Sequence, residues 1–174
     1  MFKELNILKV FFEKPTQEFN IREAARLLKI APATASKELK KLAKKRILTE
    51  KKERNLILYK SNIEDEHYQD LKIYYTIRKI KESGLIQKIN KQYLKPTIIL
   101  FGSTTQGLDT ETSDIDILIL TEKKEDLENK EEYEKKLNRK IQPFIHRTIK
   151  DIKNNHLINN ILNGITLQGE ITWT

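Results

Sequence analysis

The sequence predicts an α+β protein with a small N-terminal domain, a helical connector and a C-terminal mixed sheet flanked by helices. Three observations support this fold class. Residues 1–61 combine apolar residues at helical spacing with two short alternating runs. Residues 62–95 keep the helical spacing after a polar start. Strand-like apolar runs such as Ile115–Leu120 begin only after Pro96. We therefore expect domains at 1–61 and 96–174, joined by a connector at 62–95.

The composition narrows the class of protein. Of the 174 residues, 38% are hydrophobic and 33% are charged, which suits globular domains rather than a disordered chain. No apolar run approaches the roughly 20 residues that a membrane span needs, so we expect no membrane partner. The absence of cysteine excludes disulfides and thiolate metal sites, and a cytoplasmic location fits this composition.

Positive charge is concentrated at the start of the chain. Residues 1–60 carry 16 Lys and Arg against 7 Asp and Glu, a net charge of +9. Residues 61–174 carry 17 against 18, a net charge of −1. A localised basic excess is typical of proteins that bind polyanions, although a solvated lysine-rich surface fits the charge equally well.

Three helices are predicted in this basic segment. Apolar residues recur at helical spacing from Leu5 to Phe12, and Pro15 ends this helix. Asn20 and Glu23 have the spacing of a capping box and predict the start of a second helix. The third helix has proline in its first turn. Its apolar side carries Ala35, Leu39 and Leu42, and its opposite side carries Thr34, Ser36, Lys37, Lys40, Lys41 and Lys44.

Two alternating runs, at 47–52 and 56–61, then predict a hairpin. Helix, helix, tight turn, helix and hairpin follow one another as in a winged helix-turn-helix, which this segment resembles. The resemblance implies binding to double-stranded DNA, with the third helix in the major groove. The residues expected at base edges are Thr34, Ser36 and Lys37, and those expected at phosphates are Lys40, Lys41, Lys44, Lys51, Lys52 and Arg54. The alternative is a winged helix that makes only protein contacts or a dimer.

A second group of residues indicates chemistry in the C-terminal domain. Asp114 and Asp116 are two residues apart in a predicted strand, so both carboxylates point to the same side of the sheet. Like charges repel and are costly to desolvate, and a divalent cation, Mg²⁺ or Mn²⁺, relieves both costs. Gly102 follows another predicted strand and lets a backbone approach a phosphate, while Ser103 can donate to that phosphate and begins a helix.

The order strand, Gly102-Ser103, ten-residue gap, Asp114-Ile115-Asp116 resembles the signature of the DNA polymerase beta superfamily of nucleotidyltransferases. The resemblance is closest to the minimal nucleotidyltransferase domains and covers about residues 96–170. It implies transfer of a nucleoside monophosphate from ATP or another nucleoside triphosphate to an acceptor hydroxyl. Asp114 and Asp116 would be the catalytic metal ligands, and Gly102 and Ser103 would bind the triphosphate. The pattern continues with a helix at about 125–138, a strand at 141–145, a closing helix and a last strand within 163–169.

Two departures from that pattern leave the function open. Active members usually add a third carboxylate on the strand at 141–145, but Gln142 or Phe144 occupies that position here. Gln106 also stands where many minimal members have arginine. One reading is a DNA-binding transcriptional regulator whose second domain binds metal and nucleotide. The alternative is an active enzyme that modifies a protein or a small molecule. A scaffold with neither activity is the third reading, and a homodimer or a protein partner fits each of them.

Overall fold

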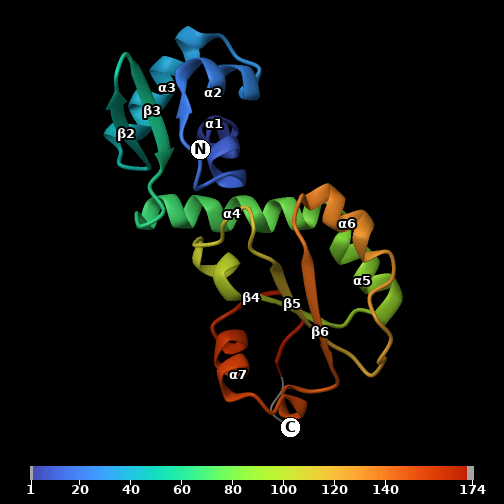
Figure 1. Cartoon of the computed structure of the whole chain (residues 1–174). Helices are drawn as coiled ribbons and strands as arrows, with labels where there is room; N and C mark the ends of the chain where they lie inside the picture. The colour runs from blue at the N-terminus through green and yellow to red at the C-terminus, as the bar shows by residue number, and fades with distance from the viewer. Residues whose placement is uncertain (1, 172–174) are drawn as a thin grey trace. The chain divides into compact units, whose positions relative to one another are not determined.

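The computed structural model describes residues 2–171, with side chains described from residue 5 onwards. The chain contains α-helices and two separate β-sheets, which confirms the predicted α+β class (Figure 1). The chain divides into two compact units, Met1–Tyr75 and Thr76–Thr174, and the division falls within helix α4 (Glu66–Glu82). No helix within the described part of the chain is both long and apolar enough to cross a membrane.

The first unit has the predicted order of elements. They are α1 (Phe2–Glu13), β1 (Phe19–Asn20), α2 (Ile21–Leu28), α3 (Pro32–Lys44), β2 (Leu48–Glu53), β3 (Leu56–Ser61) and the first part of α4. The three strands form an antiparallel sheet in the order β1-β3-β2. The short segment before α2 therefore adds an edge strand to the hairpin.

Local sequence signals set the helix boundaries of this unit. Asn20 accepts a hydrogen bond from the Glu23 backbone, and the Glu23 carboxylate accepts one from the Asn20 backbone, both at 3.0 Å. This capping box satisfies two of the free N–H groups at the start of α2. The predicted apolar side of α3 is buried, since Ala35, Leu39 and Leu42 are at most 1% exposed. Periodicity therefore predicted the buried face of α3 correctly.

Hydrogen bonds to one buried carbonyl complete the core of the first unit. The backbone oxygen of Phe11 accepts from the Ser61 hydroxyl at 2.9 Å and from the Tyr68 hydroxyl at 3.1 Å. Phe11 also packs edge-on against Phe19, with ring centroids 5.5 Å apart. The last strand and the start of α4 are thus both joined to α1.

The second unit is built on a four-stranded mixed sheet. Its elements are α5 (Leu85–Tyr93), β4 (Thr97–Phe101), η1 (Gly102–Gln106), β5 (Ile115–Leu120), α6 (Lys130–Leu137), β6 (Ile141–His146), η2 (Ile149–Asp151), α7 (Asn155–Leu162) and β7 (Ile165–Gln168). The strand order is β6-β5-β4-β7, with β5 and β6 parallel and the other pairs antiparallel. The predicted mixed sheet flanked by helices is confirmed.

Alternate residues of the central strands pack into two separate hydrophobic cores, one on each face of the sheet. Ile98, Leu100 and Ile117 pack on one face with residues of α5 such as Leu85 and Ile89. The other face carries Ile99, Phe101 and Leu118, which pack with Ile149 of η2 and Ile161 of α7. Helices therefore cover both faces of the sheet, and the second face is the one that Asp116 shares.

Two predicted helices differ from the structure. The helix expected from about residue 125 begins only at Lys130, because α5 side chains bind the preceding backbone. Gln92 donates to the Asp126 carbonyl and Tyr93 donates to the Glu125 carbonyl, each at 2.7 Å. In place of the helix expected to start at Ser103, the structure has the short 3₁₀ helix η1. A short 3₁₀ turn aligns fewer N–H groups than an α-helix does.

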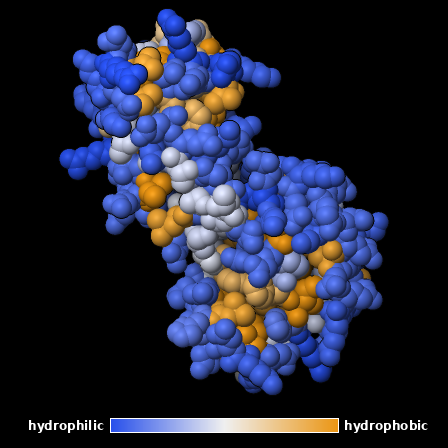
Figure 2. All heavy atoms as spheres, in the orientation of Figure 1, coloured by the Kyte–Doolittle hydropathy of each residue, from blue (hydrophilic) through white to orange (hydrophobic). Residues whose placement is uncertain are grey.

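The surface is mainly hydrophilic. Figure 2 shows hydrophilic residues over most of the viewed face of each unit, with smaller apolar patches between them. The large apolar side chains that are exposed include Leu27, Leu56, Leu94, Leu108 and Leu162. Isolated apolar side chains are normal on a protein surface and need no functional explanation.

Candidate functional site

The two aspartates lie at the start of β5. Asp114 directly precedes the strand, and Asp116 is its second residue. Asp116 is paired with Phe101 of β4 on one side and with Gln142 of β6 on the other. Directly paired residues project from the same face of a sheet, so Gln142 lies beside Asp116 on that face. Phe144 is instead paired with Leu118.

Phe144 belongs to the core rather than to the site. Its ring packs against that of Phe101, with centroids 5.2 Å apart. Of the two residues that the sequence offered for the position of a third carboxylate, the strand register therefore selects Gln142.

Gly102 is in direct contact with the Asp116 carboxylate. A Cβ added to Gly102 would lie 2.5 Å from Asp116 Oδ2, closer than real Cβ atoms approach. The backbone of Gly102 also has a φ of +78°, which favours glycine. Ser103 follows in η1 and is partly buried. The structure thus brings Gly102, Ser103 and Asp116 together at the end of β4.

The electrostatics of the pair favour a cation. The pKa of Asp116 is raised above its ordinary value, chiefly because the carboxyl is partly buried and secondly because Asp114 is close. The Arg139 guanidinium acts in the opposite direction. Two carboxylates and the amide oxygen of Gln142 are hard oxygen ligands. Mg²⁺ commonly binds one or two carboxylates together with water and substrate phosphates, so these residues fit such an ion. No cluster of three or more His, Cys, Asp or Glu suited to a metal occurs among residues 2–171.

Arg139 joins the loop before β5 to the start of β6, and sequence reasoning missed it. Its Nε donates to the Ser113 carbonyl at 2.6 Å and its Nη2 donates to the Asp114 carbonyl at 2.9 Å. Its Nη1 is hydrogen-bonded to the carboxylate of Asp109, which is only 2% exposed. These three contacts hold the backbone that carries Asp114. No short motif in the sequence links Arg139 to residues that lie 25 to 30 positions earlier.

The residues predicted to contact DNA lie on α3 and on the hairpin of the first unit. Thr34 and the α3 lysines are exposed, whereas Ser36 is partly buried. Lys52 and Arg54 are exposed, and Arg54 takes a φ of +53° in the hairpin turn. The exposed α3 lysines are Lys37, Lys40, Lys41 and Lys44.

Lys51 differs from the other hairpin cations, because its charge is paired. Its Nζ lies 3.0 Å from Glu53 Oε2, two residues further along β2. Both side chains are more than half exposed, so this ion pair is weak and stabilises the hairpin little. Even so, Lys51 presents less net positive charge to a phosphate than the neighbouring Lys52 does.

Comparison with known families agrees with the geometry of the second unit. Residues 82–167 match the family model of the nucleotidyltransferase domain. The chain contains a nucleotidyltransferase domain. The matched range extends from the end of α4 to β7 and includes Gly102, Ser103, Asp114 and Asp116. It also includes α5, which the sequence prediction counted in the connector and which packs on the sheet. No curated protein and no solved structure matches the chain.

Proposed function

We propose that the protein is a DNA-binding transcriptional regulator whose nucleotidyltransferase domain binds Mg²⁺ or Mn²⁺ and, with it, a nucleoside triphosphate such as ATP. The observation that carries this proposal is the pairing of Asp116 with Gln142. The site has the carboxylates of Asp114 and Asp116, and Gly102 lies against that of Asp116. The residue paired with Asp116, however, is a neutral amide. Such a site can hold a cation and still lack the charge and the base that rapid transfer requires.

The residues have separate roles in this proposal. Asp114 and Asp116 would hold the cation, whose charge would offset that of the triphosphate. Gly102 leaves open backbone beside Asp116, and Ser103 supplies a hydroxyl donor at the same end of β4. Arg139 keeps Asp114 in place through its backbone carbonyl.

The test of the metal site is thermal unfolding of the full chain with Mg²⁺, Mn²⁺ and ATP. We expect the cation to raise the midpoint temperature of the wild type but not of Asp114→Asn/Asp116→Asn. The matched control is Asp126→Asn/Glu170→Gln, which removes two exposed carboxylates outside the site and should keep the shift. A shift that persists in the first variant would place the cation elsewhere.

The DNA-binding part of the proposal rests on the first unit. Its element order fits a winged helix-turn-helix, and α3 presents four exposed lysines on the side opposite its buried face. Lysines on an exposed helix that fits the major groove would neutralise phosphates there. The proposal includes a homodimer, because helix-turn-helix dimers bind paired half-sites on DNA. It also includes a cytoplasmic location, where the protein would have access to DNA and nucleoside triphosphates.

The test of DNA binding is fluorescence anisotropy with duplex DNA at several salt concentrations. We expect Lys40→Ala/Lys41→Ala/Lys44→Ala to weaken binding and to lower the slope of log K against log salt by up to about 3. The control Lys124→Ala/Lys150→Ala/Lys153→Ala removes the same charge from the second unit and should bind like the wild type. Equal binding by both variants would rule out α3 as the DNA-contacting helix.

A second candidate function is active nucleotidyl transfer to a hydroxyl of a protein or a small molecule. The observation that favours it is the retained contact between Gly102 and Asp116. In that reaction the acceptor oxygen bonds to the α-phosphorus, pyrophosphate leaves with the electrons of the broken P–O bond, and the hydroxyl proton passes to solvent. Transfer of label from an α-labelled nucleoside triphosphate, lost in Asp114→Asn/Asp116→Asn, would establish this function. Mg²⁺-dependent nucleotide binding without transfer would favour the regulator.

A further inference from the structure

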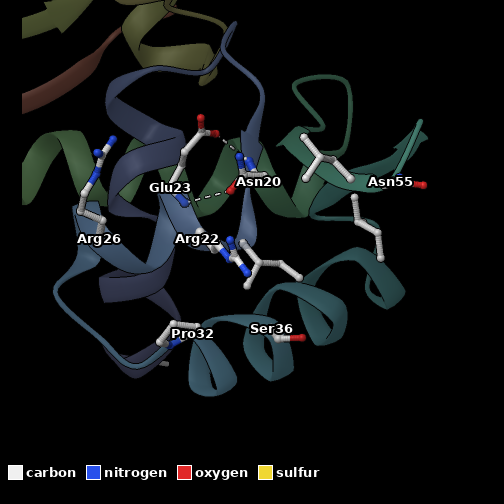
Figure 3. Close-up of a pocket in the computed structure, with 10 residues that line it drawn as sticks. Asn20, Arg22, Glu23, Arg26, Pro32, Ser36 and Asn55 are labelled. Atoms are coloured by element: carbon white, nitrogen blue, oxygen red, sulfur yellow. Dashed lines mark hydrogen bonds between the residues drawn. The ribbon is translucent and has the colours of Figure 1, made fainter.

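Each unit has a cavity on its surface that differs from the other in position and lining. The groove between α2, α3 and the hairpin is lined in part by Ser36, so it adjoins the surface already proposed to bind DNA (Figure 3). A cavity of about 440 Å³ lies in the second unit, between the segments that follow β5 and β6. Its size is within the range of cavities that hold small ligands. Thr121, His146 and Arg147 line it, residues to which the proposed function gives no role.

This cavity lies at the opposite end of β5 from the aspartates. β5 and β6 run side by side in the same direction, so their carboxyl ends meet at one edge of the sheet (Figure 1). The backbone N–H of Thr121 donates to the His146 carbonyl at 2.8 Å and joins these two ends. Thr121 comes five residues after Asp116, which at the rise of an extended strand separates them by roughly 16 Å. A small ligand in the cavity would therefore not touch the metal site.

The lining of the cavity is positively charged. Its cations are Lys123, Lys124 and Arg147. The acid in the lining is Asp151, so three cations against one acid give a net charge of +2, with histidine counted as neutral. The Asp151 carboxylate accepts a hydrogen bond from the backbone N–H at the start of η2, at 2.9 Å, and is thus partly engaged within the protein. The lining therefore attracts an anion, although residues 61–174 as a whole carry a net charge of −1.

Arg147 already holds one anion, the carboxylate of Glu122. Its Nε donates to a Glu122 oxygen at 2.8 Å. The two side chains are 66% and 75% exposed, so this ion pair is weak and can open. A phosphate dianion carries more charge than a carboxylate and can accept two parallel hydrogen bonds from the planar guanidinium. A phosphate in the cavity would therefore displace Glu122 from Arg147.

Neutral groups add donors for the same phosphate oxygens. The Oγ1 atom of Thr121 accepts a hydrogen bond from the Lys123 backbone at 3.2 Å, which leaves its own O–H able to donate. His146 is partly buried, and its ring presents at least one N–H. Ile145 gives the cavity an apolar wall. Inorganic phosphate would leave this wall without a contact, whereas a phosphate carried by a small organic group would cover it.

We propose that this cavity binds the phosphate group of a small phosphate monoester, with Arg147 and Lys124 as its charged contacts and Thr121 as a hydroxyl donor. The inference goes beyond the proposed function, because it uses neither the metal site nor the residues proposed to bind DNA. Glu122 competes with the ligand for Arg147. Removing the Glu122 charge should therefore strengthen binding, an effect that general attraction to a basic surface would not concentrate at one site.

The test is a titration of the ¹⁵N-labelled full chain with ribose 5-phosphate, followed by heteronuclear NMR without divalent cations and at constant ionic strength. We expect the backbone signals of Thr121 and Arg147 and the Nε–H signal of Arg147 to shift together. Arg147→Gln should weaken binding by about tenfold or more, because it removes charge-assisted hydrogen bonds. Glu122→Gln should strengthen binding by about two- to fivefold, as expected for the loss of an exposed competing ion pair.

Arg78→Gln is the matched control for the arginine substitution. It also removes one charge from an exposed ion pair, with Glu82 on α4, but Arg78 does not line the cavity. Its affinity for ribose 5-phosphate should equal that of the wild type. Inorganic phosphate, titrated in the same way, should bind more weakly than ribose 5-phosphate. Equal or tighter binding of inorganic phosphate would overturn the assignment of a monoester.

The remaining outcomes separate this inference from the proposed function. Equal affinity of Arg147→Gln and the wild type, or weaker binding by Glu122→Gln, would overturn the inference. Asp114→Asn/Asp116→Asn should bind ribose 5-phosphate like the wild type, and signal shifts confined to Gly102 and its neighbours would place the phosphate at the proposed metal site instead. A missing Mg²⁺-dependent thermal shift would refute the metal site without changing the result expected for this cavity.

Discussion

Asp116 of β5 is paired in parallel register with Gln142 of β6. The two side chains therefore leave the same face of the sheet, next to the end of β4 where Gly102 contacts the Asp116 carboxylate. A neutral amide consequently stands where a third carboxylate would increase the negative charge of the site. A single substitution at Gln142 would therefore change the net charge of the site.

Gln142→Glu should tighten Mg²⁺ binding by about tenfold or more, because a further negative charge would lie close to the bound cation. In the absence of metal the same change should lower the midpoint of thermal unfolding, since three carboxylates repel one another. Isothermal titration calorimetry and thermal unfolding with and without Mg²⁺ measure the two effects. Gln87→Glu adds the same charge on α5 and should change neither. A weaker affinity for Mg²⁺ in Gln142→Glu would show that the cation does not bind beside this residue.

Arg139→Ala should lower the free energy of unfolding by about 3 kcal/mol, because it leaves the buried Asp109 carboxylate without its arginine partner. Arg147→Ala is the control. Its ion pair with Glu122 is 2.8 Å long but exposed to solvent, so its loss should lower the free energy of unfolding much less than the loss of Arg139 does. Urea unfolding measures both. Equal effects of the two changes would mean that Arg139 does not stabilise the loop before β5.

Gly102→Ala should destabilise the protein by about 1–3 kcal/mol and abolish the Mg²⁺-dependent thermal shift. The new methyl group would collide with Asp116 and displace its carboxylate. Gly84→Ala separates this collision from backbone strain. Gly84 also has a positive φ, of +87°, but its added Cβ would meet nothing closer than 3.9 Å. Gly84→Ala should therefore lose some stability and keep the metal response. A metal response retained in Gly102→Ala would exclude Asp116 as a ligand.

Glu134→Gln should reduce stability at neutral pH by about 1 kcal/mol, and the difference from the wild type should disappear in acid. The pKa of Glu134 is lowered from 4.5, first because its carboxylate accepts a hydrogen bond from the Ile141 backbone, at 2.9 Å, and then because of Lys130. A lowered pKa in the folded state stabilises it above pH 4.5, and this stabilisation is lost as the pH falls below that value. Urea unfolding from about pH 7 to about pH 3 measures the difference.

The elements that could be predicted from the sequence are those that depend on near neighbours along the chain. The spacing of Ala35, Leu39 and Leu42 predicted the buried side of α3, and Asn20 with Glu23 predicted the capping box. The predicted nucleotidyltransferase domain is confirmed by the family match over residues 82–167. It could be predicted because its signature lies within one short segment of the sequence. The start of α6 was predicted too early, since it depends on hydrogen bonds to α5 from a different part of the chain.

The sequence by itself determined the α+β class, the apolar faces of the helices and the two-residue spacing of Asp114 and Asp116. Helical and strand periods are properties of consecutive residues, so they can be read without knowing the fold. Only the tertiary structure decided that Gln142 pairs with Asp116 and that Arg139 holds the backbone of Asp114. The register of two parallel strands depends on how the helix between them packs, and a contact across 25 residues depends on the closure of the whole sheet. Neither the strand register nor this contact can be read from a local pattern of the sequence.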